Sequence, residues 1–205
     1  MILEAGNWSE GERKLEALGL DVSSIHDALL YGHAERETYT SFDAPGAGEY
    51  ARWTRQIRRL SEVYVPQGWT RINPDNQPTI VHPSNRHSLV VASGNVFTGV
   101  RYATPSTKNP RGRSIRTAVD NNAALVDLAE LEPALAGLKE TWMLLSFHSP
   151  DGKIYSEVSL PNSMSGEFIS GWHHRILMPP VDPQGGEADA RDEEPPSYDF
   201  AVVRK

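Results

Sequence analysis

The chain has 205 residues, a formal net charge of −7 and no cysteine. This length suits one domain that buries a sizeable core, and the absence of cysteine excludes disulfides, thiolate metal sites and cysteine nucleophiles. The first residues lack the basic flank and the apolar run of a signal peptide, and no apolar run approaches the length that spans a bilayer. We therefore expect a cytoplasmic protein that does not enter a membrane.

Apolar residues at spacings of three and four predict helices in the first third of the chain. Ser9 and Glu12 have the spacing of a capping box at the start of one helix, which Gly19 would end. A second helix is expected over 21–38 and a third over 48–65. The apolar stripe of the third helix comprises Tyr50, Trp53, Ile57, Leu60 and either Val63 or Tyr64.

Beyond Trp69 the pattern changes to short apolar runs, rich in β-branched residues and bounded by Pro, Asn, Ser and Gly. Such runs are typical of strands, and the Pro-Asp-Gly turn at 150–152 is typical of a hairpin. The expected elements are strands over 78–83, 87–93 and 166–180, a strand or bend over 94–100, a loop over 102–113, a hairpin over 141–161 and a helix over 114–138 that is interrupted near Pro133.

These elements predict an α+β fold, in which N-terminal helices precede a mostly antiparallel sheet with one inserted helix. The expected parts are a helical N-terminal part over 1–65, an α+β core over 66–180, an acidic flexible segment over 181–197 and a terminal strand over 198–205. The hydrophobic core is expected to include Trp53, Ile57, Leu60, Ile80, Leu89, Val91, Leu125, Leu128, Trp142, Leu144, Val158, Leu160 and Ile176.

Charge is distributed unevenly along this acidic chain. The span from Asn76 to Val119 contains no acid and carries six Lys or Arg residues. Much of this charge lies in the loop that leads into the inserted helix, where free backbone N–H groups and the helix dipole favour an anion. The candidate anion-binding residues are Arg101, Lys108, Arg111, Arg113 and Arg116. A solvated loop that faces acidic neighbours would explain the same charge.

Metal and catalytic sites have weaker support. His82 and His87 bracket a turn, but the surrounding span offers no third metal ligand, so no metal or cofactor is expected. Acid–base candidates lie on or near predicted strands, without a recognisable catalytic motif, and catalytic residues stay unassigned. Sequence spacing does not show whether five histidines meet at one site: His82, His87, His148, His173 and His174.

Several short segments resemble one group of bacterial proteins. "GNVFTG", "TPSTKNPRG" followed by "AVDNN", and "EVSLP" followed by "WHHRILMPP" are similar to uncharacterised proteins carried on plasmids and integrative elements. The resemblance covers about 78–180, and this chain departs from it with Arg111 where the group prefers Lys. It implies a cytosolic accessory protein of mobile DNA, and it transfers no catalytic residue.

Three functions follow from these patterns. The first is binding of nucleic acid or a phosphate ligand through the basic loop, joined by an arginine face of the third helix formed by Arg52, Arg55 and Arg59. The second is an enzyme that acts on a small phosphorylated or nucleotide substrate. The third is a protein-interaction or inhibitor module that uses the acidic surface. The acidic segment over 182–197 is also a candidate cover for the basic loop.

Overall fold

The computed structural model describes residues 8–128 and 139–185. It begins with three helices, α1 (Trp8–Ala17), α2 (Val22–Arg36) and α3 (Ala47–Tyr64). The predicted stop at Gly19 is confirmed by its left-handed φ of 69°, and Asp21 caps α2 by accepting a hydrogen bond from the Ser24 N–H at 2.7 Å. No helix among the described residues combines the length and the apolar character that a membrane crossing requires.

The sheet has six strands: β1 (Thr70–Ile72), β2 (Thr79–Val81), β3 (His87–Ser93), β4 (Glu140–His148), β5 (Ile154–Ser165) and β6 (Phe168–Leu177). They lie in chain order, and every neighbouring pair is antiparallel except β3 and β4. Helix α4 (Arg113–Leu128) follows β3 and precedes β4, because a parallel pair needs a long connection between its strands. Short 3-10 turns, η1 (Val65–Gln67) and η2 (Pro74–Asn76), flank β1. The predicted α+β class is confirmed.

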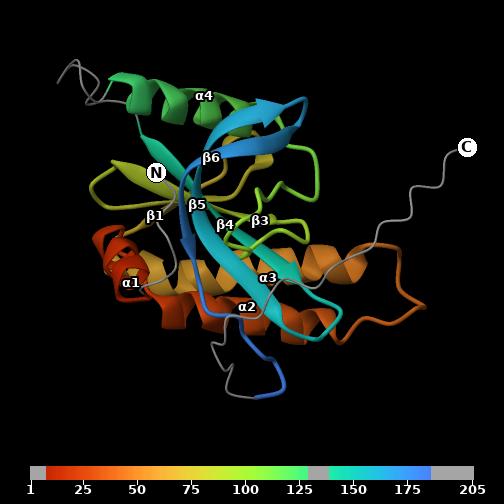
Figure 1. Cartoon of the computed structure of the whole chain (residues 1–205). Helices are drawn as coiled ribbons and strands as arrows, with labels where there is room; N and C mark the ends of the chain where they lie inside the picture. The colour runs from red at the N-terminus through yellow and green to blue at the C-terminus, as the bar shows by residue number, and fades with distance from the viewer. Residues whose placement is uncertain (1–7, 129–138, 186–205) are drawn as a thin grey trace, which may run out of the picture.

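Helices cover both faces of the sheet: α1, α2 and α3 lie on one side and α4 on the other (Figure 1). Alternation along the central strands divides the core accordingly. Leu89 and Val91 of β3 face the N-terminal helices, whereas Val90 and Ala92 face α4. The same alternation in β4 sends Trp142 and Leu144 toward the helices and Met143 and Leu145 toward α4.

Most of the predicted core is found in the larger cluster, but Leu125 is only half-buried. The buried side of α4 contains Ile115, Val119 and Asn122, at helical spacing, and Leu125 lies beside that line. Tyr50 is a second correction: it is 66% exposed rather than part of the buried stripe of α3. The side chain of Leu128 lies outside the described residues.

Helices α2 and α3 approach each other closely at Gly32. A Cβ atom at this position would lie 2.7 Å from the Arg52 carbonyl oxygen and 2.6 Å from Cγ of Gln56. Because the helices are so close, Arg52 and Gln56 lie in the interface between them, and both are buried. This packing explains why the buried side of α3 includes an arginine that the apolar pattern leaves out.

The last part of the chain is described as far as Gly185. Before that point Val181 is buried and forms an antiparallel bridge with Ile154, at the start of β5. Most of the predicted acidic segment and the predicted strand over 198–205 lie outside the described residues, as does the predicted helical continuation over 129–138.

Candidate functional site

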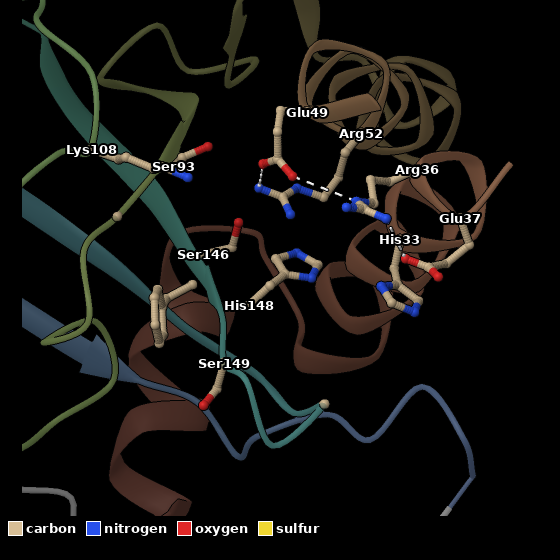
Figure 2. Close-up of a pocket in the computed structure, with 13 residues that line it drawn as sticks. His33, Arg36, Glu37, Glu49, Arg52, Ser93, Lys108, Ser146, His148 and Ser149 are labelled. Atoms are coloured by element: carbon tan, nitrogen blue, oxygen red, sulfur yellow. Dashed lines mark hydrogen bonds and ion pairs between the residues drawn. The ribbon is translucent and has the colours of Figure 1, made fainter. Parts of the chain in front are cut away.

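A cavity of about 330 Å³ opens between the N-terminal helices and the ends of the central strands. Ser93 ends β3 and His148 ends β4, so the cavity lies at the carboxyl ends of the two parallel strands. Ligands of sheets with parallel strands commonly bind at such ends. The lining residues are His33, Arg36, Glu37, Glu49, Arg52, Ser93, Gly94, Lys108, Ser146, Phe147, His148, Ser149 and Gly152 (Figure 2).

The strand side of the pocket is a polar continuation of the larger core. Side chains that alternate along β4 place Ser146 and His148 on the face that carries Trp142 and Leu144. Ser93 occupies the corresponding position at the end of β3, where it pairs with Ser146. The apolar side chains of this face are therefore followed by hydroxyl and imidazole groups in the last residues of β3 and β4.

The helix side supplies charges of both signs. His33, Arg36 and Glu37 come from the end of α2, and Glu49 and Arg52 come from the first turns of α3. The Glu49 carboxylate lies between two arginines: it forms an ion pair with Arg52 and reaches Nε of Arg36 at 3.6 Å (Figure 2). Arg52 is only 6% exposed, so its charge is fixed deep in the pocket wall.

The loop between β3 and α4 forms the third side and brings Lys108 to the pocket. It begins with a tight turn, in which a Cβ atom at Gly94 would lie 2.0 Å from Oγ1 of the buried Thr98. The Asn95 side chain accepts hydrogen bonds from the N–H groups of Phe97 and Ser106. The loop then returns to the strand, where the Lys108 N–H donates to the Ser93 carbonyl at 2.8 Å.

A buried ion pair holds this loop against the sheet. Glu157 on β5 is fully buried and pairs with Nη2 of Arg175 on β6 at 2.5 Å. Glu157 also accepts the Gly99 N–H at 2.9 Å, and Gly99 has a φ of 77° that other residues rarely adopt. Arg175 donates to the carbonyl oxygens of Val100 and Ala103 at 3.1 and 2.6 Å. The pair thus holds three residues of the loop that carries Lys108, namely Gly99, Val100 and Ala103.

His148 is an uncharged imidazole in a pocket that also contains three Lys or Arg side chains. Burial, together with the charges of Arg52, His33, Arg36 and Lys108, lowers the pKa of His148 to about 3. Its ring stacks on His33, with centroids 5.6 Å apart and planes inclined by 18°. Nε2 of His148 and Nδ1 of His33 are buried and have no hydrogen-bond partner among the described residues. The pair offers hydrogen-bonding atoms that the described fold itself leaves unused.

The low pKa of His148 predicts a loss of stability in mild acid. The unfolded chain, with a histidine pKa near 6.5, takes up the proton before the folded chain does, so protonation favours unfolding as pH falls from about 6.5 toward about 3. We expect this residue alone to lower the free energy of unfolding by about 2 kcal/mol between pH 7 and pH 5. Urea unfolding at both pH values should show a smaller difference in His148→Gln than in the parent. An equal difference in both proteins would contradict the assignment.

The structure separates the predicted anion-binding residues. Lys108 lines the pocket, whereas Arg111 and Arg116 contact the turn between β5 and β6. The Arg111 N–H donates to the Glu167 carbonyl at 2.7 Å, and Nη2 of Arg116 donates to the Gly166 carbonyl at 2.6 Å. Lys108 is therefore part of the pocket, whereas Arg111 on the loop and Arg116 in the first turn of α4 lie against the β5–β6 turn.

The remaining members of the set lie outside the pocket as well. Arg113 is exposed at the first position of α4, and Arg101 lies over the Tyr102 ring at 5.4 Å. Burial lowers the pKa of Arg111 to about 10, and its Nε has no hydrogen-bond partner among the described residues. Anion binding by these loop arginines stays a prediction.

The arginine face expected on α3 is engaged in ion pairs. Arg55 reaches Glu35 at 3.2 Å, and Arg59 reaches Asp27 at 2.5 Å, so both bridge to α2. Arg52 is buried at the pocket beside Glu49. Acidic side chains of α2 and α3 neutralise these three arginines. They therefore do not form one continuous basic surface together with the loop.

Of the five histidines singled out from the sequence, only His148 lines the pocket. His82 and His87 stack on each other with ring centroids 4.4 Å apart, and His87 also contacts the Leu18 carbonyl at 2.8 Å. His173 and His174 have ring centroids 4.2 Å apart on β6. Among the described residues no group of three or more His, Asp or Glu side chains has an arrangement that could hold a metal ion.

The sequence patterns missed His33 and Arg36, and they placed Arg52 on an arginine face of α3 rather than in a pocket. Each lies on a helix whose apolar spacing gives no sign of a site, and they meet His148 only through the packing of α2 and α3 on the sheet. The one local signal is the change from apolar to polar side chains along β4. Comparison of the chain with protein-family models, with curated proteins and with solved structures finds no match.

Proposed function

We propose that this protein binds a small anionic ligand, with a phosphate-type group, in the pocket at the ends of β3 and β4. The observation that carries the proposal is the convergence of three cations from three segments on one cavity: Arg36 from α2, Arg52 from α3 and Lys108 from the loop. The guanidinium of Arg52 is buried in the cavity wall beside Glu49, where an anionic ligand that takes the place of this carboxylate would contact it.

The remaining polar groups suit the same ligand. Ser93, Ser146 and Ser149 offer hydroxyl groups that donate to phosphate oxygens, and a neutral His148 can donate or accept one hydrogen bond. A cavity of about 330 Å³ has the size of a small-molecule site. It therefore favours a small phosphorylated molecule over direct enclosure of a nucleic-acid duplex.

Isothermal titration calorimetry with phenyl phosphate tests this proposal. We expect Lys108→Ala to weaken binding by about tenfold, which is the loss of one charge-assisted contact of about 1.4 kcal/mol. Arg113→Ala removes the same charge from an exposed position outside the pocket and is the matched control. No binding by the parent, or the same loss in both variants, would contradict the pocket.

Acid–base catalysis on the bound ligand is a second candidate function. His148 is the candidate base, since its unprotonated imidazole lines the pocket together with three serine hydroxyls, but a pKa of about 3 makes it a weak base and predicts slow turnover. Hydrolysis of p-nitrophenyl phosphate by the parent and by His148→Gln tests it. Turnover that the substitution leaves unchanged would exclude His148 as the base.

A role as a cytosolic accessory protein of mobile DNA is a broader proposal, and it rests on the sequence resemblance over about 78–180. Nucleic acid is the partner proposed for the exposed arginines at the start of α4, Arg113 and Arg116, through phosphate contacts. Binding of this type falls steeply as salt increases. A heparin column developed with a salt gradient would show later elution of the parent than of Arg113→Ala/Arg116→Ala.

A further inference from the structure

The pocket already contains an anion of its own, the Glu49 carboxylate. One carboxylate oxygen of Glu49 pairs with Nη2 of Arg52, and the other lies 3.6 Å from Nε of Arg36. Figure 2 shows this carboxylate joined by dashed lines to both guanidinium groups, with Lys108 on another segment across the view. A ligand anion that approaches Arg52 must therefore compete with Glu49 for the same donors.

The two partners of this ion pair are held very differently. The Arg52 side chain is 7% exposed, whereas the Glu49 side chain is 42% exposed. Arg52 is also fixed by the close approach of its helix to Gly32. Glu49 lies in the first turn of α3, where the helix dipole favours a carboxylate even when it points into solvent. The cation must stay in the pocket, while the carboxylate is free to rotate out.

We propose that Glu49 is an internal competitor that limits the pocket to dianionic phosphate-type groups and excludes simple carboxylates. The inference rests on the proposed function, since it assumes that an anion binds beside Arg52. A monocarboxylate that displaces Glu49 brings only the same charge to Arg52. Its association also costs translational and rotational entropy, so the displacement is unfavourable overall. A phosphate dianion brings a second charge and a third oxygen.

The second negative charge of a dianion can interact with Lys108, which also lines the pocket. Glu49 reaches only the helix side of the pocket, Arg36 and Arg52, whereas Lys108 lies on the loop side (Figure 2). A dianion with three terminal oxygens can contact cations on both sides at once. Release of Glu49 also leaves three cations against the single lining acid Glu37, which favours two negative charges over one.

Calorimetric titrations with phenyl phosphate and benzoate, which share the same ring, test the inference. The parent should bind phenyl phosphate and show no measurable affinity for benzoate. In Glu49→Gln both affinities should rise by about tenfold, which brings benzoate into the measurable range. The reason is that the neutral amide no longer competes for Arg52.

Glu37→Gln is the matched control, because it removes another lining acid that pairs with Arg36 and not with Arg52. Its effect should be a small gain that high salt abolishes, whereas the gain from Glu49→Gln should persist in high salt. Weaker or unchanged phenyl phosphate binding by Glu49→Gln would overturn the inference and assign Glu49 the task of orienting Arg52. If neither the parent nor any variant binds phenyl phosphate, the proposed pocket itself fails, and this inference fails with it.

Discussion

Replacement of Arg175 by methionine is expected to lower the free energy of unfolding by about 3–5 kcal/mol. The substitution leaves Glu157 as a fully buried carboxylate without its cation. It also removes the donors to the carbonyl oxygens of Val100 and Ala103. Each of these groups then keeps its cost of desolvation and loses the hydrogen bond that offset it. Urea unfolding followed by circular dichroism measures the loss.

Two comparisons make this result specific. Arg58→Met removes an arginine from the exposed pair with Glu62 and should change the free energy of unfolding far less than Arg175→Met does. The double variant Glu157→Gln/Arg175→Met removes both buried charges, and it should be more stable than Arg175→Met alone. A loss below about 1 kcal/mol in Arg175→Met would contradict the description of this pair as the anchor of the loop.

Asn122→Ala is expected to cost about 3 kcal/mol of unfolding free energy. Asn122 is 0% exposed and joins α4 to two strands. Its amide nitrogen donates to the carbonyl oxygens of Thr141 and Pro161 at 3.0 and 2.9 Å, and its oxygen accepts the Thr141 N–H at 2.9 Å. Alanine leaves three buried backbone groups unpaired, each at a cost of about 1 kcal/mol or more.

The neighbouring residue is a suitable control for this substitution. Asn121 is half-buried on the same helix, so Asn121→Ala makes the same chemical change without breaking the three bonds of Asn122. Alanine favours the helix slightly more than asparagine, and the control should therefore stay within about 0.5 kcal/mol of the parent. Equal effects of the two substitutions would show that Asn122 does not fasten α4 to the sheet.

The fold class was predictable because its signals are local. A continuous apolar run marks β3, alternation of apolar residues marks β5, and the turn at 150–152 marks the hairpin of β4 and β5. The periodicity of α3 marks the longest described helix. The parallel pairing of β3 with β4 has no such signal, since it depends on where the connection through α4 places the second strand. Periodicity also misjudged Tyr50, which belongs to the apolar pattern and is exposed.

The site was predictable only in part, and for a physical reason. The basic loop drew attention to Lys108, and His148 was one of the five histidines singled out from the sequence. Arg52 was expected on an arginine face of α3, because an arginine off the apolar stripe is normally solvated, but the contact of α3 with Gly32 buries it. A pocket assembled from α2, α3, a loop and two strand ends is a property of tertiary packing, which spacing along the chain does not encode.

The contrast between the pocket and the basic loop gives the most direct test of where an anion binds. NMR spectra of the arginine side-chain Nε–H groups, recorded during a titration with phenyl phosphate, report on each guanidinium separately. Our account predicts that the signals of Arg36 and Arg52 shift in proportion to ligand binding, while those of Arg113 and Arg116 stay unchanged. Shifts of Arg113 and Arg116 with an unmoved Arg52 would contradict it, and would place the anion at the start of α4 instead.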